Sequence, residues 1–380
     1  MRMKSSWDTA RNVLCVRLDH MGDVLMTTPA LRALKQQNPH RRLTLLASSN
    51  GFEVGHAIPE VDEVMRYDAP WHKSAPLREA SDDYAAFKAL IDRRFDAAAI
   101  FTVYSQSPLP SALMCFLAGI PLRLAHCREN PYQLLTHWIQ ESEPHQRVRH
   151  EVQRQLDLVA TVGCHTQNQR LSFHVPPIAG VRVTKLLEQL GVNLENPWLV
   201  IHPGATALSR RYPPQQFASA ARRLSRDLNY QVVFTGALTE QSLVEQIRTD
   251  MRLSSYSLVG KLNLTELAAL ISMSCVLICN NTGPAHLAAA VETPVVDLYA
   301  LTNPQHTPWH VPNRVLSHDV PCKYCYKSVC PQGHNDCLRL VTPDQIVMAV
   351  QELMREKRRS NLIPFPIKSI GKRIPIVASR

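Results

Sequence analysis

A short acidic segment near the N-terminus holds residue types that can move a proton. The segment Asp19-His20-Met21-Gly22-Asp23 comes two residues after an apolar stretch at 13–16. A carboxylate such as Asp23 at a helix start is favoured in its charged form by the helix dipole, and in a cleft it can accept a proton from a hydroxyl nucleophile. The same aspartate can also be a helix cap and nothing more. One glycine is present where a dinucleotide fingerprint needs three, so that motif is excluded while proton transfer and capping both stay open.

Three segments in the second half of the chain share another pattern, an apolar stretch followed by a glycine. They are His202-Pro203-Gly204-Ala205-Thr206, Thr235-Gly236-Ala237 and Asn281-Thr282-Gly283-Pro284-Ala285-His286. In the third, Thr282 can cap a helix with a proline near its first position, and free N–H groups at such a helix start bind anions without a metal. Each segment alone is typical of an ordinary turn between a strand and a helix, and His286 is equally typical of a packed core histidine.

Paired arginines extend this pattern. Arg210 and Arg211 follow Gly204 closely, and their guanidinium groups suit phosphate oxygens. Lys261 is a further candidate cation. Glycine segments and adjacent arginines in one half of the chain favour a diphosphate ligand there. No Asp-x-Asp pair lies near a glycine turn, so the sequence does not indicate a catalytic metal.

A cysteine cluster lies near the end of the second half. Ten cysteines at irregular spacings in 380 residues argue against a disulfide framework. Four soft ligands at short spacing can close a tetrahedral site for a structural zinc or iron ion, and a loop of reduced thiols is the alternative. The four residues of the cluster, which also encloses His334, are Cys322, Cys325, Cys330 and Cys337.

Alternating apolar and amphipathic stretches predict the elements that position these residues. Strands are expected at 13–16, 42–47, 97–103, 198–201, 231–235, 257–259, 275–279 and 295–299. Helices are expected at 24–37, 80–93, 215–228, 238–251, 264–273 and 284–291. This alternation is typical of parallel α/β sheets, which bind ligands at the carboxyl ends of their strands. The alternation of strands and helices is interrupted at Pro176-Pro177, which is typical of a linker between two domains. We therefore expect an N-terminal domain at 1–175, a C-terminal domain at 176–355 with a cysteine-rich loop at 321–338, and a basic mobile tail at 356–380.

Charge and composition limit the partners. The net charge is +10, and residues 355–380 hold eight Lys or Arg and one acidic residue. Such a segment can be simply solvated or can approach an anionic membrane surface, whereas nucleic-acid binding is disfavoured because no aromatic stacking pattern accompanies the charge. A hydrophobic fraction of 45% excludes a mostly disordered chain. No run reaches the roughly 18 apolar residues of a membrane span. The charged N-terminus is unlike a secretory signal, so we expect a cytoplasmic protein.

Four segments recur in a family order from about Val13 to Thr342. They are VLCVRLDHMGDVLMTTPAL, HPGATALSRRYP, FTGALTEQ and NNTGPAHLAAAVETPVVDLYALTNP. Together they resemble the ADP-heptose:lipopolysaccharide heptosyltransferases, glycosyltransferase family 9. The resemblance implies an α/β GT-B fold, in which two Rossmann-like domains face a cleft. In that fold the N-terminal domain, 1–175, would bind the acceptor and the C-terminal domain, 176–355, would bind the nucleotide sugar. The resemblance also implies that the helix expected at 343–357 crosses back to the first domain.

The resemblance assigns roles to individual residues. Asp23 matches the family's general base, Arg210 stands where a phosphate-contacting lysine is usual, and Glu240 matches an acid near the nucleotide ribose. Asn281 replaces the usual aspartate and supplies no charge. The resemblance therefore indicates the class of reaction more firmly than it indicates the identity of the donor. The acceptor-side loop is Asp19, His20, Met21 and Gly22. With the residues above, the candidate donor site comprises Gly204, Arg210, Arg211, Gly236, Glu240, Lys261, Asn281, Thr282, Gly283 and His286.

These expectations describe an inverting, metal-independent glycosyltransferase, peripheral on the inner membrane. Its donor would be a nucleotide sugar, ADP-heptose above all, and its acceptor lipid-linked or the lipopolysaccharide core. The alternatives are a transferase with another nucleotide sugar or a protein acceptor, a GT-B-fold sugar-nucleotide epimerase, and a metal-containing module whose tail binds nucleic acid.

Overall fold

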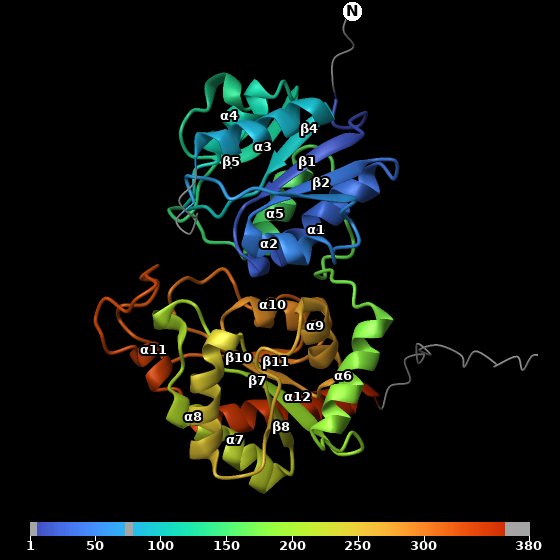
Figure 1. Ribbon diagram of the computed structural model, residues 1–380. Coiled ribbons are helices and arrows are strands. Elements are labelled where there is room, and N and C mark those ends of the chain that lie inside the picture. The colour runs from blue at the N-terminus through green and yellow to red at the C-terminus, as the bar shows by residue number, and fades with distance from the viewer. Residues whose placement is uncertain (1–5, 73–78, 362–380) are drawn as a thin grey trace, which may run out of the picture.

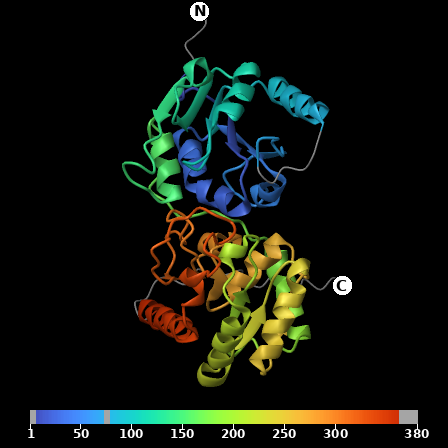
Figure 2. The same ribbon diagram turned by 90° about the vertical axis from the view of Figure 1, so that its left-hand side faces the viewer.

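Two parallel sheets organise the molecule, one from each half of the chain (Figure 1). The computed structural model describes residues 6–72 and 79–361. Each sheet and the helices packed on it are called a lobe below, and the lobes lie one above the other in both views (Figures 1 and 2). Within the described ranges, no helix combines the length and the apolar character needed to traverse a membrane.

The first lobe contains a six-stranded sheet in the order β3-β2-β1-β4-β5-β6, which is the Rossmann order. One face packs on α1, α2 and α5, and the other on α3 and α4. The strands are β1 Asn12–Arg17, β2 Arg42–Ala47, β3 Glu63–Arg66, β4 Ala97–Ile100, β5 Leu122–Cys127 and β6 His137–Gln140. The helices are α1 Met21–Gln37, α2 Ser49–Gly55, α3 Ala80–Arg93, α4 Leu109–Leu117, the 3₁₀ turn η1 Tyr132–Leu134 and α5 Glu151–Ala160.

The second lobe repeats this topology. Its sheet order, β12-β11-β10-β7-β8-β9, is the same Rossmann order in the second set of strands. The strands are β7 Trp198–His202, β8 Gln231–Phe234, β9 Tyr256–Ser257, β10 Leu277–Asn280, β11 Val295–Leu298 and β12 Asn313–Leu316. The helices are α6 Pro177–Gln189, η2 Leu208–Arg210, α7 Pro214–Leu228, η3 Leu238–Glu240, α8 Gln241–Met251, α9 Leu264–Met273, α10 Gly283–Ala290, α11 Asp336–Arg339 and α12 Pro343–Asn361.

Central strands are buried on both faces because helices cover each side of the sheets. All four residues of β4 and of β10 are buried, as expected for parallel strands between two helix layers. Strand order reverses between β1 and β4 in one lobe and between β7 and β10 in the other. The crevice at such a reversal is where open α/β sheets bind ligands. Here α1 follows β1 and packs against α10, which follows β10, so both reversals lie near the contact between the lobes.

Several sequence predictions need correction. Helix α1 begins at Met21, so most of the expected loop is already helical. Three edge strands, β3, β6 and β12, and the inner strand β5 were not predicted. Helix α12 does not cross back to the first lobe; it packs against α7 and β12, because its apolar face completes the second core (Figure 2).

The predicted domain limits and tail are only partly covered by the structure. The first sheet ends at Gln140 and the second begins at Trp198, while the limits 1–175 and 176–355 stay predictions. Residues 356–361 belong to α12, where Arg314 pairs with Glu356, and the rest of the predicted tail lies outside the described residues.

Candidate active site

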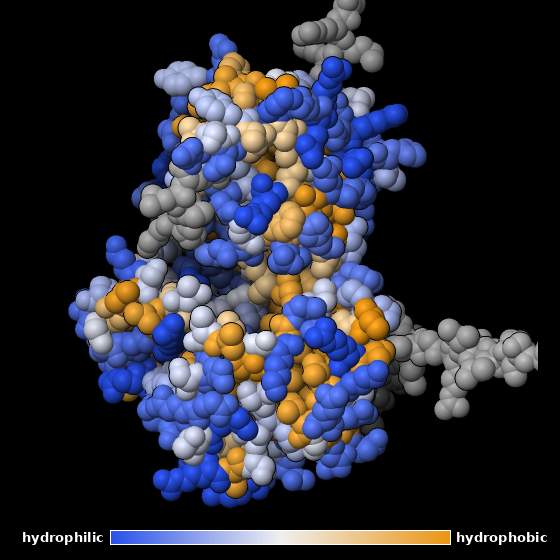
Figure 3. Space-filling view, in the orientation of Figure 1, coloured by the Kyte–Doolittle hydropathy of each residue, from blue (hydrophilic) through white to orange (hydrophobic). Residues whose placement is uncertain are grey.

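A cavity of about 840 Å³ lies between the lobes. The surface is visibly hollowed between them in Figure 3. The first lobe lines the cavity with His20, Met21, Gly22, Asp23, Met26 and Asn50. The second lobe's lining includes His202, Gly204, Thr206, Arg210, Gly236, Glu240, Asn281, Thr282, Gly283, His286, His306 and Ser328. The cavity is in the size range of small-molecule sites, and any ligand that fills it contacts both lobes.

Arg17 at the end of β1 is fully buried and binds three carboxylates. Its Nε lies 3.1 Å from Asp19 Oδ2, and its Nη1 lies 3.0 Å from Glu151 Oε1. The third contact, 3.3 Å, joins Nη2 to Asp23 Oδ1. Burial alone would lower the pKa of Arg17, but the carboxylates outweigh it and raise the pKa above its ordinary value. The rigid fork of one guanidinium therefore orients three acids at once.

Asp23 lies in the first turn of α1 and is 17% exposed. One carboxylate oxygen faces Arg17, and the other accepts a hydrogen bond from the His20 backbone N–H at 3.3 Å. Asp23 therefore caps the helix and also lines the cavity, so the two roles considered from the sequence do not exclude each other. The cap and the arginine fix its orientation, and its exposed part is accessible to a ligand.

Asp19 is placed behind the cavity wall. It is buried, accepts a hydrogen bond from Gln106 Nε2 at 2.6 Å and lies 3.5 Å from His72 Nε2. Burial alone would raise the pKa of Asp19, but Arg17, followed by His72 and Gln106, holds that pKa well below its usual range. Asp19 is therefore a permanently charged partner of Arg17 rather than a residue of the cavity wall.

The first turns of α1 and α10 join the lobes. A Cβ at Gly22 would lie 2.7 Å from His286 Cδ2, closer than real Cβ atoms approach another atom. Met21 contacts Gly283 in the same region. Burial, and then nearby basic side chains, lower the pKa of His286 to about 3, so its ring is neutral. A glycine is required at position 22 because the histidine of the other lobe packs directly on it.

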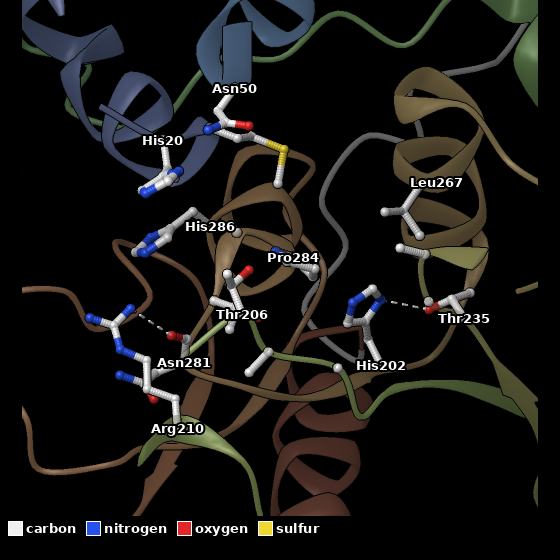
Figure 4. Close-up of a pocket in the computed structure, with 18 of the residues that line it drawn as sticks. His20, Asn50, His202, Thr206, Arg210, Thr235, Leu267, Asn281, Pro284 and His286 are labelled. Carbon is white, nitrogen blue, oxygen red and sulfur yellow. Dashed lines mark hydrogen bonds between the residues drawn. The ribbon is translucent and has the colours of Figure 1, made fainter. Parts of the chain in front are cut away.

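Glu240 lies over Gly204, where any Cβ would overlap its carboxylate. Its Oε2 accepts a hydrogen bond from the Ala237 N–H at 2.8 Å and lies 3.8 Å from His202 Nε2. His202 Nδ1 is in turn 3.0 Å from Thr235 Oγ1 (Figure 4). The glycine segments that contain Gly204 and Gly236 therefore both contact the side chain of Glu240.

Arg210 reaches the third glycine segment. Its Nη1 donates to the Asn281 carbonyl at 3.5 Å, and Figure 4 shows the two side by side. Asn281 is buried, and its side-chain oxygen accepts the Ala300 N–H at 3.2 Å. Thr282 follows as the N-cap residue of α10. Arg210 and the start of α10 therefore lie together on the cavity wall, and the Asn281 amide holds that turn in place.

The cysteine-rich loop supports the segment that carries Arg210. Ser209 N–H donates to the Ser328 carbonyl at 3.0 Å, and Ser209 Oγ donates to the Lys327 carbonyl at 2.8 Å. The ring of Tyr326 lies 6.1 Å from that of Tyr104 in the first lobe. This supporting role was not predicted from the sequence.

The metal site considered for the loop is not supported. In residues 6–72 and 79–361, no three His, Cys, Asp or Glu side chains lie close enough together to bind one metal ion. Cys322 Sγ lies 3.9 Å from His334 Nε2, whereas Cys337, on α11, packs against the second core. Burial, and then the other cysteines of the cluster, raise the pKa of Cys337. The thiols therefore face different surroundings, and Cys325 and Cys330 are half-buried free cysteines.

Two predicted cations lie off the cavity wall. Arg211 is exposed, and its Nε donates to the Ala205 carbonyl at 2.7 Å. Lys261 is also exposed. A contact between either residue and a diphosphate stays a prediction. Arg17, Glu151 and His306 are the site residues that the sequence reasoning missed. The available sequence signal for Arg17 was an arginine between a predicted apolar strand at 13–16 and an acidic segment.

Comparisons with known proteins agree with this architecture. The model of glycosyltransferase family 9 (heptosyltransferase) matches residues 84–335. The chain is 23% identical over 356 residues to lipopolysaccharide heptosyltransferase 2 of Escherichia coli (strain K12), covering 91% of this chain and 99% of that protein. It is 26% identical over 308 residues to lipooligosaccharide heptosyltransferase 2 of Haemophilus influenzae, covering 78% of this chain and 85% of that protein.

Solved structures show the same fold. A family 9 glycosyl transferase from Veillonella parvula DSM 2008 superposes with a TM-score of 0.79 at 20% identity, covering 93% of this chain and 99% of that one. E. coli ADP-heptose lps heptosyltransferase II superposes with a TM-score of 0.71 at 22% identity, covering 91% of this chain and 99% of that one. These likenesses confirm the predicted GT-B fold. Because the family model matches more than half of the chain, this protein belongs to glycosyltransferase family 9, the heptosyltransferases, and is a glycosyltransferase.

Proposed function

We propose that the protein transfers heptose from ADP-heptose to the lipopolysaccharide core or a related surface-glycan acceptor. The names of its relatives, lipopolysaccharide and lipooligosaccharide heptosyltransferases, support this assignment. The observation that carries it is the shared cavity. Asp23 lines it from the first lobe, while Arg210 and the start of α10 line it from the second.

In this proposal the second lobe binds the donor. Arg210 and the N–H groups at the start of α10 hold the diphosphate, because both are positive and neither needs a metal. Glu240, over Gly204, accepts hydrogen bonds from the ribose hydroxyls. The close fit at Gly204 means that a side chain there would displace Glu240 from this position.

The first lobe then activates the acceptor. An acceptor hydroxyl attacks the anomeric carbon of the donor, and its proton passes to the Asp23 carboxylate. The bond from that carbon to the β-phosphate oxygen breaks, and its electron pair leaves with the nucleoside diphosphate. Arg210 and the α10 N-terminus stabilise the charge that develops. A single displacement inverts the anomeric centre. Since fixed positive groups lie where the charge develops, we propose that no catalytic metal ion is required.

Donor identity can be tested directly. Transfer and thermal stability should be measured with ADP-heptose and with UDP-, GDP- and CMP-sugars, because Asn281 replaces the aspartate usual in the family. A donor at 100 times its Kd should stabilise the protein by about 2.7 kcal/mol. We expect ADP-heptose alone to give both stabilisation and transfer. Stabilisation by another nucleotide sugar, with none by ADP-heptose, would contradict the assignment.

We also propose that the enzyme works in the cytoplasm at the inner membrane surface. The eight Lys and Arg residues at 355–380 support this, because basic residues near anionic lipid gain about 1 kcal/mol each. Deletion of 362–380 removes four of these eight residues, so much less of the shortened protein than of the full chain should sediment with phosphatidylglycerol vesicles. Equal retention of both proteins would count against the proposal.

A further inference from the structure

A loop of the second lobe reaches across to the first. We call residues 301–311, between β11 and β12, the bridging loop. The Gln305 carbonyl accepts the Glu151 N–H at 3.1 Å, and the Thr307 carbonyl accepts a hydrogen bond from His150 Nε2 at 2.8 Å. Both partners begin α5 of the first lobe. The residue between these two anchors is His306, so its position relative to both lobes is fixed by the backbone.

The His306 ring lines the cavity without a partner of its own. Its backbone N–H donates to Tyr299 Oη at 3.2 Å, which further fixes the residue. Its Nε2 is shielded from water and has no hydrogen-bond partner among the described residues. A polar atom that is shielded from water and has no hydrogen-bond partner lowers the stability of the protein when the cavity is empty. Because His306 is a lining residue, a ligand in the cavity can supply the missing hydrogen bond if the ring turns toward it.

Negatively and positively charged side chains both influence the ring of His306. Asp23 of α1 and Glu151 of α5 favour its charged form, while Arg17 of β1 and Arg210 of η2 oppose it. Burial is the largest influence and lowers the pKa of His306, so the ring is neutral when the cavity is empty. A diphosphate would add negative charge to this balance and favour protonation.

His286 of α10 is the other histidine on this wall, and its surroundings differ. No carboxylate favours its charged form; His306, His150 and Arg210 all disfavour it. Its ring also packs on the Gly22 backbone, which leaves no room for rearrangement. Of the two rings, only that of His306 has carboxylates among the groups that influence its charge, so we take it as the ring that responds to a bound anion.

We propose that His306 binds the donor's β-phosphate and takes up a proton as the nucleoside diphosphate binds. This inference rests on the proposed function. The β-phosphate is bonded to the reacting sugar, so it must lie toward Asp23, which lines the same cavity as His306 and is close enough to influence its charge. A protonated imidazole has two N–H donors and would stabilise the leaving diphosphate together with Arg210.

Calorimetry on the full-length protein near pH 7 tests this inference. ADP and AMP binding should be measured in two buffers of different ionisation enthalpy, for the wild type, His306→Gln and the control His318→Gln. His318 is exposed and outside the cavity lining. We expect His306→Gln to bind ADP about 10- to 100-fold more weakly and to lose the proton uptake. Its AMP affinity should change less than about threefold, because AMP lacks the β-phosphate. His318→Gln should match the wild type.

Equal losses of ADP and AMP affinity, or unchanged proton uptake in His306→Gln, would overturn the inference and leave the proposed function intact. If the wild type bound none of ADP, UDP, GDP and CDP, both would fail. The pH dependence of wild-type binding provides a test that needs no variant. As pH rises above about 7, ADP affinity should fall more steeply than AMP affinity, and parallel curves would contradict the inference.

Discussion

The two walls of the cavity hold charge in opposite ways. In the first lobe, Arg17 is buried and bound by three carboxylates, so the charges are satisfied within the protein. In the second lobe, Arg210 forms no salt bridge within residues 6–72 and 79–361, and its contact is a carbonyl at 3.5 Å. The cation of the first wall is therefore fully paired inside the protein by carboxylates that outnumber it three to one, while the second wall keeps a positive charge, unpaired within the described residues, for a ligand.

This difference matches two chemical tasks. A group that accepts a proton needs a fixed direction, which Arg17 and the His20 N–H give to Asp23. A group that binds a polyanion must not already be neutralised, which describes Arg210. The contrast predicts that loss of Arg17 acts through stability and loss of Asp23 through proton transfer, whereas loss of Arg210 acts through turnover.

The largest expected effect is that of Arg17→Met. Removing the buried cation leaves Asp19 and Glu151 buried without their partner, so the free energy of unfolding should fall by about 3–5 kcal/mol. Urea unfolding of both proteins measures this. A loss below about 1 kcal/mol would show that the carboxylates do not depend on the arginine.

Arg210→Ala should act on turnover instead. Loss of one group that stabilises the leaving charge should lower kcat by about 10²–10³-fold. The free energy of unfolding should stay within about 0.5 kcal/mol of the wild type. The exposed neighbour Arg211 offers a matched control, and Arg211→Ala should lower kcat far less. If the two variants lost the same activity, the assignment of the phosphate contact to Arg210 would be wrong.

Gly22→Ala tests the contact between the walls. The added methyl group would overlap His286, and relieving the overlap should cost about 1–3 kcal/mol. Thermal unfolding measures the cost, with Gly180→Ala as control because a Cβ there meets open space. An unchanged unfolding temperature for Gly22→Ala would indicate that the lobes are not packed together here in solution.

The smallest effect concerns pH. The pKa of His286 is lowered to about 3 in the folded state, so below its ordinary value of 6.5 the unfolded chain binds the proton first. Stability should therefore fall by about 0.7 kcal/mol as the pH drops from 7 to 6. Unfolding measured across this range should show a shallower slope for His286→Asn. Identical slopes would mean that His286 is not held neutral.

Features formed by neighbouring residues could be predicted from the sequence, whereas contacts between residues far apart in the chain could not. Gly204, Gly236 and Gly283 were found because strand, glycine and helix follow one another in the chain. The role of Arg17 was missed because its partner Glu151 is 134 positions away. The strands β3, β6 and β12 were missed for a related reason. Each lies at a sheet edge, where few residues are buried, so no apolar run marks it.

The most direct test of the account is Asp23→Asn, with heptose transfer and ADP binding measured on the same preparation. The amide keeps the size of the side chain but cannot act as the base, so transfer should fall by about 10²–10⁴-fold. ADP affinity should stay within about twofold of the wild type, because in the proposed function the nucleotide is bound by the other lobe. Retained transfer, or a parallel loss of ADP affinity, would contradict the division of labour between the two walls.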